Sequence, residues 1–154
     1  MTLAAYILKR NGVPMGAPNS LRNMLKRSLG AKDFRTFWNH WNPIFGYFLA
    51  YKIFKPLKKA SPEGIALLLT FVFCGGIHDL VTFLYRGETR FLFSWWFAFM
   101  GLAILFTDFL GVNFASKAWW IRATSNLLLI GICYLGAYAI KNYFGVSIQL
   151  NNLF

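Results

Sequence analysis

A long apolar run over residues 65–84 is interrupted by an adjacent histidine and aspartate, His78 and Asp79. The run holds about 20 residues, which as an α-helix is long enough to cross the hydrocarbon core of a bilayer. Hydrocarbon offers no water to solvate an imidazole or a carboxylate, so ionisable side chains inside a span are costly and mark functional sites. His78 is therefore the first candidate functional residue, and the next question is which residue faces it.

The composition predicts a membrane protein. Of its 154 residues, 57% are hydrophobic and only 14% are charged, whereas soluble domains average about 25% charged residues. Strand signals are weak, and only helices or closed barrels can span lipid. We expect an all-α integral membrane protein with about three transmembrane helices, a partial or re-entrant helix and an amphipathic N-terminal region.

The charge is concentrated at the start of the chain. The formal net charge is +11, and Asp33 is the only acid in residues 1–60. This asymmetry predicts a cytoplasmic N-terminus and attraction to the lipid bilayer through anionic headgroups. Nucleic acid is the rival partner for a basic arm, but it is not expected, because aromatic residues lead directly from these charges into membrane-type sequence. Eleven of the sixteen basic residues lie in this first part: Lys9, Arg10, Arg22, Lys26, Arg27, Lys32, Arg35, Lys52, Lys55, Lys58 and Lys59.

Two regions are expected along the chain. Residues 1–33 read as a basic amphipathic region at the membrane surface, with a short entry segment, a Pro- and Gly-containing loop and one short helix. Residues 34–154 read as a helical membrane domain. Start signals at Asn42-Pro43 and Ser61-Pro62-Glu63, together with apolar runs, predict helices over residues 43–57, 62–85, 91–111 and 119–140.

The first two of these helices form a hairpin that brings two polar residues to one depth. Asn42 lies 18 residues before Ala60, at the centre of the turn, and His78 lies 18 residues after it. Short connections make antiparallel neighbours, so both residues are expected roughly 25 Å from the basic turn. The aromatic stretch 34–41 would then re-enter the membrane as non-helical backbone, which is tolerated only where it is walled by protein or lines a cavity.

An imidazole and an amide at such a cavity suit acyl transfer. A neutral histidine is a competent general base for an incoming hydroxyl, and an asparagine amide can donate a hydrogen bond to a developing oxyanion. No Ser/His/Asp constellation is apparent, which favours direct transfer over a covalent acyl-enzyme. Cys74 and Cys133 lie in apolar segments without metal-ligand spacing, so they read as small buried residues and no metal site is indicated.

Other interpretations of these residues stay open. His78 can simply bond to a neighbouring helix, and Asn42 can be a mere helix cap. His40 falls near the same depth, so it rivals either residue, and the two histidines together suit axial haem ligation. Asp79 either orients His78 or binds a basic partner.

Three segments in order resemble the catalytic region of the membrane-bound O-acyltransferase family. They are Phe-Trp-Asn-His-Trp-Asn-Pro over residues 37–43, Lys-Pro-Leu over 55–57 and Phe-Cys-Gly-Gly-Ile-His-Asp over 73–79. The similarity is to the wax-synthase-like and the sterol and diacylglycerol acyltransferase branches. It implies that Asn42 and His78 are the catalytic pair, that Asp79 stands where glutamate is common, and that acyl-CoA or a related thioester is the co-substrate, with no further cofactor. The expected supporting or substrate-binding residues are Trp38, His40, Trp41 and Asp79.

The resemblance also sets expectations about assembly and location. Family members usually have several hundred residues and a ring of helices around a substrate tunnel, which about three and a half helices do not enclose. We therefore expect a homo-oligomer or a complex with another membrane protein, in the bacterial inner membrane. The alternative is a non-catalytic membrane subunit built on a reduced acyltransferase fold.

Overall fold

The computed structural model describes residues 1–145 and 147–149. Nearly all of the regular structure is helical, with one pair of two-residue strands in which Glu88 is opposite Gln149. In chain order the elements are α1 (Leu3–Asn11), α2 (Ser20–Leu29), α3 (Phe34–His40), α4 (Pro43–Phe48), the π-helix η1 (Leu49–Phe54), α5 (Lys55–Ala60), α6 (Glu63–Arg86), β1 (Glu88–Thr89), α7 (Leu92–Phe109), α8 (Trp119–Phe144) and β2 (Ile148–Gln149).

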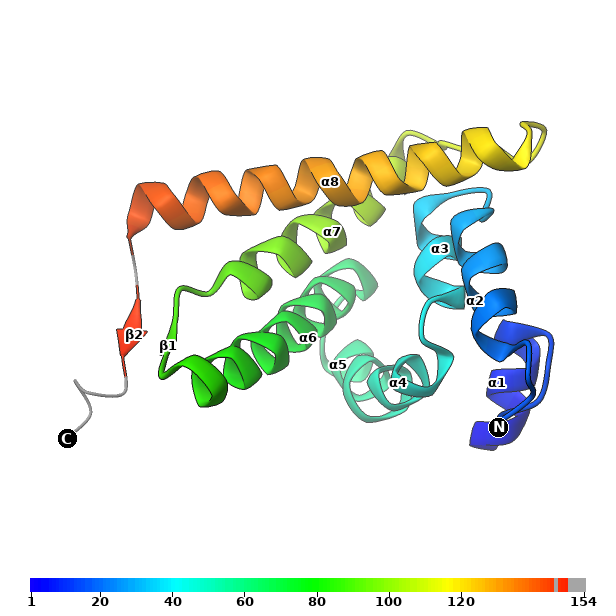
Figure 1. Cartoon of the computed structure of the whole chain (residues 1–154), viewed down its shortest axis with the longest axis horizontal. Helices are drawn as coiled ribbons and strands as arrows, with labels where there is room; N and C mark the ends of the chain where they lie inside the picture. The colour runs from blue at the N-terminus through cyan, green and yellow to red at the C-terminus, as the bar shows by residue number, and fades with distance from the viewer. Residues whose placement is uncertain (146, 150–154) are drawn as a thin grey trace.

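Three helices of the described residues, α6, α7 and α8, are long and apolar enough to span a membrane. They lie side by side in Figure 1, with α6 packed on α7 and α7 packed on α8. The short helices α1, α2 and α3 stack across one end of these spans (Figure 1). The predicted all-α membrane fold, with three spans and an amphipathic N-terminal region, is confirmed.

The interface between α6 and α7 is close because of one glycine. A Cβ atom on Gly75 would lie 2.5 Å from the Phe93 carbonyl oxygen and 2.7 Å from the Cα of Ser94, so only glycine fits there. Its neighbour Gly76 has no heavy atom within 4 Å of the same position. Of these two adjacent glycines, Gly75 is the one that allows the two helices to approach.

Three hydrogen bonds attach the C-terminal end of α2 and the residues that follow it to α8. The Asn126 amide donates to the carbonyl oxygens of Leu29 and Ala31, at 3.0 and 3.1 Å. The Trp119 indole N–H donates to the Lys26 carbonyl at 3.0 Å. Within residues 1–33, α2 and the residues just after it therefore pack directly against α8.

The aromatic stretch after residue 33 is helical, so the prediction of non-helical backbone there is wrong. Asp33 caps α3, with its carboxylate 2.6 Å from the backbone N–H of Thr36. Phe34 and Phe37 are fully buried in the main core. A side-chain cap and two apolar residues on one helical face are enough to form this short helix.

The helix that begins at Pro43 continues beyond its predicted end near Pro56. It reaches Ala60 by changing to π geometry over η1, just before Pro56. Proline lacks an N–H and its ring clashes with the carbonyl four residues earlier, and a π segment changes that spacing without breaking the helix. The two arms of the hairpin also diverge, because η1 and α5 pack against α6 whereas α4 packs against α1 and α3.

Candidate active site

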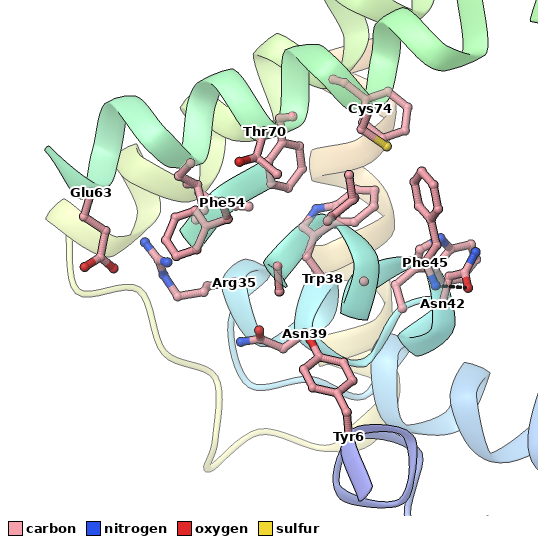
Figure 2. Close-up of a pocket in the computed structure, with 18 of the residues that line it drawn as sticks. Tyr6, Arg35, Trp38, Asn39, Asn42, Phe45, Phe54, Glu63, Thr70 and Cys74 are labelled. Carbon is pink, nitrogen blue, oxygen red and sulfur yellow. Dashed lines mark hydrogen bonds between the residues drawn. The ribbon is translucent and has the colours of Figure 1, made fainter. Parts of the chain in front are cut away.

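A cavity of about 290 Å³ lies where the hairpin opens. Figure 2 shows α6 along one side of it, with Trp38 of α3 and the α4 region on the other. The residues that α6 contributes are Glu63, Leu67, Thr70, Phe71, Cys74 and His78. These share one face of the helix, and the 15 positions between the first and the last correspond to about 22 Å along the axis. The cavity is therefore an elongated groove that follows α6.

Four of the six residues singled out in the sequence line this groove, namely Asn42, His78, Trp38 and Trp41. His40 and Asp79 are not among its lining residues. The imidazole of His78 and the amide of Asn42 thus share one cavity, as predicted. The other two candidates, His40 and Asp79, lie outside its lining.

The surroundings of His78 determine which of its ring nitrogens is basic. Nδ1 lies 2.8 Å from the Cys74 carbonyl oxygen, which can only accept, so Nδ1 carries the proton and donates it. In the neutral ring, Nε2 then holds the lone pair, and it has no hydrogen-bond partner within residues 1–145 and 147–149. The ring stacks on Phe97 and lies near Phe93, with centroid distances of 5.1 and 5.5 Å. His78 is thus held on one side and open on the other.

Asn42 stands at a strained position at the start of α4. Its φ of 39° and ψ of 69° are left-handed, a conformation that asparagine tolerates better than most residues. Its Oδ1 accepts the backbone N–H of Phe45 at 3.2 Å, and Pro43 follows as the first helical residue. The predicted helix cap is therefore present. The side-chain N–H₂ group makes no hydrogen bond within the described part of the chain, so it is the part of Asn42 that can donate to a ligand.

The two tryptophans form different parts of the cavity wall. Trp38 meets the ring of Phe71 edge-on at 5.2 Å and that of Phe97 at 5.9 Å, so it packs in the core beside the groove. Trp41 stacks on Phe37 at 5.5 Å and is 37% exposed. Trp38 fixes the inner wall, and Trp41 lies at the open side.

His40 connects two N-terminal helices. Its Nδ1–H donates to the Arg10 carbonyl at 2.8 Å, which joins α3 to α1. Burial lowers the pKa of His40, and the charges of Arg27 and Arg10 act in the same direction, against the opposing effect of the hydrogen bond. Because only His78 lines the groove, the two imidazoles do not face each other across it as a pair of axial haem ligands would.

Within the described residues, Asp79 makes no direct hydrogen bond to His78 and no ion pair with a basic side chain. It is buried, and its carboxylate accepts the backbone N–H groups of Phe93 at 3.1 Å and Ser94 at 2.7 Å. The Thr89 hydroxyl lies 3.4 Å from the same carboxylate. Asp79 of α6 thus caps the N-terminus of α7. One sequence signal pointed to this, because Phe91 at the start of α7 has no side chain able to cap it.

Charged residues gather at the end of the groove farthest from His78. Figure 2 shows Arg35 and Glu63 pointing toward one another there. Arg35 pairs with Asp108 at 2.6 Å and Glu63 with Lys58 at 2.5 Å, all partly exposed. Sequence reasoning missed Arg35, whose partner is 73 residues away. The groove therefore has one charged end and one end with an imidazole and an amide.

No protein-family model, curated protein or solved structure matches the chain. The resemblance to membrane-bound O-acyltransferases accordingly stays a prediction from three short motifs. Within residues 1–145 and 147–149, no group of three or more His, Cys, Asp and Glu side chains is arranged to hold a metal ion.

Proposed function

We infer that the protein is a membrane acyltransferase, which moves an acyl group from a thioester donor such as acyl-CoA to a hydroxyl acceptor. The observation that carries this proposal is the joint position of His78 and Asn42 on one apolar groove. In each side chain one polar atom is hydrogen-bonded to the backbone, namely Nδ1 of His78 and Oδ1 of Asn42. The other polar group, Nε2 of the imidazole or the N–H₂ of the amide, makes no hydrogen bond within the described residues. A proton acceptor and a donor are the two groups that acyl transfer requires.

In the proposed reaction, His78 Nε2 takes the proton of the acceptor hydroxyl as its oxygen attacks the thioester carbonyl carbon. The Asn42 N–H₂ donates to the oxyanion of the tetrahedral intermediate. The carbon–sulfur bond then breaks, and the imidazolium returns its proton to the thiolate leaving group. The products are an ester and a free thiol, with no net change at the enzyme.

The surrounding charge supports the proposed cytoplasmic N-terminus, and the proposed location is the bacterial inner membrane. The basic helices α1 and α2 lie at the same end of the spans as the start of α8, with Lys117 and Arg122. Cytoplasmic ends carry an excess of Lys and Arg. A thioester such as acyl-CoA, made in the cytoplasm, would therefore reach the protein from the basic end of the spans.

The test is acyl transfer by purified protein in lipid nanodiscs, with a labelled acyl-CoA and candidate alcohols. The His78→Ala variant is expected to lose on the order of 100-fold or more of the turnover, since general acid–base catalysis contributes about that much. The matched control is His40→Gln, because His40 does not line the groove. Equal turnover by wild type and His78→Ala would end the proposal.

A non-catalytic subunit is the second candidate, and the openness of the site favours it. His78 and Asn42 are both exposed in the isolated chain, so a further chain, a second copy or another membrane protein, would be needed to enclose the groove. Native purification separates the two functions. A stable complex without transfer activity, alone or with its partner, would support the subunit role.

A further inference from the structure

The closest contact between α6 and α7 lies directly beside His78. Gly75 precedes the histidine by three residues, and Asp79 follows it immediately. Gly75 abuts the backbone of Phe93 and Ser94, and the Asp79 carboxylate accepts hydrogen bonds from the same two residues. Two positions one helical turn apart on α6 thus hold the first turn of α7, one by close packing and the other by hydrogen bonds.

The hydrogen bonds from Asp79 replace a capping side chain that α7 lacks. The first backbone N–H groups of a helix need acceptors, and these normally come from a capping side chain just before the helix. Here that residue is Phe91, in left-handed conformation and without a capping atom. A buried carboxylate at the positive end of a helix is favourable, so Asp79 supplies from another helix what the local sequence lacks.

The start of α7 carries the two aromatic rings that pack against the imidazole of His78. Phe93 lies in the first turn of α7, and Phe97 lies one turn further. Both rings lie against the His78 imidazole, with interplanar angles of 33° and 27°. If α7 shifted or frayed at its start, the imidazole would lose this support, and its hydrogen bond to the Cys74 carbonyl would no longer be the preferred arrangement.

We propose that Asp79 is a positioning residue for the acyltransferase reaction: by capping α7 it holds Phe93 and Phe97 against His78 and keeps Nε2 as the basic nitrogen. This inference rests on the proposed function for its kinetic consequence, but its structural consequence does not depend on activity. Asp79 touches neither substrate nor the reacting atoms, since it is not a lining residue of the groove.

The experiment uses the fact that the chain has only two histidines. In ¹⁵N-histidine-labelled protein in nanodiscs, His40→Gln leaves a single imidazole, so the tautomer of His78 is read directly from its nitrogen shifts. We expect the Nδ1–H form in the parent and a mixture of tautomers in Asp79→Ala. Phe93 and Ser94 bond to different oxygens of Asp79, so Asp79→Asn keeps one of the two acceptors and should give a spectrum between those of the parent and Asp79→Ala. Glu88→Gln, which removes a nearby carboxylate that does not bond to α7 within the described residues, is the matched control.

Turnover adds the kinetic test. Asp79→Ala should reduce kcat by roughly 10- to 100-fold with little change in KM, because misplacing a catalytic group has an effect of that order. Asp79→Asn, which keeps one of the two acceptor oxygens, should lose less of kcat than Asp79→Ala. An unchanged His78 spectrum in a folded Asp79→Ala protein would overturn the inference. If the alanine variant does not fold, an unchanged His78 spectrum in Asp79→Asn would overturn it. A tautomer change without any transfer by the wild type would instead refute the proposed function and leave the positioning role standing.

Discussion

The two flanks of α6 are built in opposite ways. Toward α7 the helix is in backbone contact, with Gly75 and Asp79 fixing the approach. Toward α4 and η1 it faces a cavity of about 290 Å³ along nearly two-thirds of its length. His78 stands between these flanks, supported by the first and open to the second. The difference teaches that rigidity and space, both of which a reactive site needs, are supplied here by separate neighbours of one helix.

The largest expected effect breaks the tight flank. Gly75→Leu places a side chain where backbone atoms of Phe93 and Ser94 already lie, and backbone cannot move as a flexible side chain can. We expect a loss of about 3 kcal/mol of unfolding free energy, the upper end for overpacking. Steric trapping in bicelles measures it.

The adjacent glycine supplies the control. Gly76→Leu adds the same side chain where nothing lies within 4 Å, so its stability should stay within about 0.5 kcal/mol of wild type. Similar losses in both variants would show that the α6–α7 contact is not the selective constraint described above.

The same type of change on the open flank should act on activity and spare stability. Ala50 of η1 lines the groove, so the larger side chain of Ala50→Leu is expected to occupy groove space. We expect unchanged unfolding free energy and a fall of roughly 10- to 100-fold in kcat/KM, the range for altered contacts in an apolar pocket. A loss of stability with unchanged kcat/KM would mean that this flank is packed core and not a binding groove.

The sequence predicts some features of the spans and of the candidate site, and not others. Hydropathy and start signals located the three spans to within a few residues, because length and apolar content alone decide whether a helix can cross a bilayer. The hairpin geometry also predicted that Asn42 and His78 share a site, and both line the groove. That they lie at the same depth stays a prediction, because the two arms of the hairpin diverge and the first contains the π segment η1.

The rest depended on tertiary contacts. Pro56 was taken as a helix end by local rules, whereas the helix accommodates it through the π segment η1. Asp79 and Arg35 bond to groups 14 to 15 and 73 residues away, and no local pattern specifies such partners. Residues 34–40 were predicted to lack helical structure because the hairpin geometry placed them inside the membrane, whereas Asp33 caps them as a short helix.

A smaller change sharpens the account of the tight flank. Thr89 donates to Asp79 and accepts the backbone N–H of Phe91, so Thr89→Val removes one supporting hydroxyl without changing volume much. The expected loss is about 1 kcal/mol, the usual net value of a hydrogen bond. Thr82→Val, on the exposed side of α6, is the control and should stay within about 0.5 kcal/mol. Equal stability of the two variants would remove Thr89 from the α6–α7 contact.

The smallest effect concerns the outer wall of the open flank, where His40 joins α3 to α1. Burial lowers the pKa of His40 below its usual value of about 6.5, so the unfolded chain binds a proton more readily than the folded one. The stability that His40 contributes is therefore fully present above about pH 6.5 and is lost as the pH falls toward its folded pKa. Amide hydrogen exchange in α1 and α3, corrected for the intrinsic rate, should increase from pH 7.5 to pH 5, while exchange in α7 changes little. In His40→Gln, which is neutral throughout, this increase should disappear. An identical increase in wild type and variant would assign the pH response to other groups, and the wall of the groove would then be insensitive to the protonation of His40.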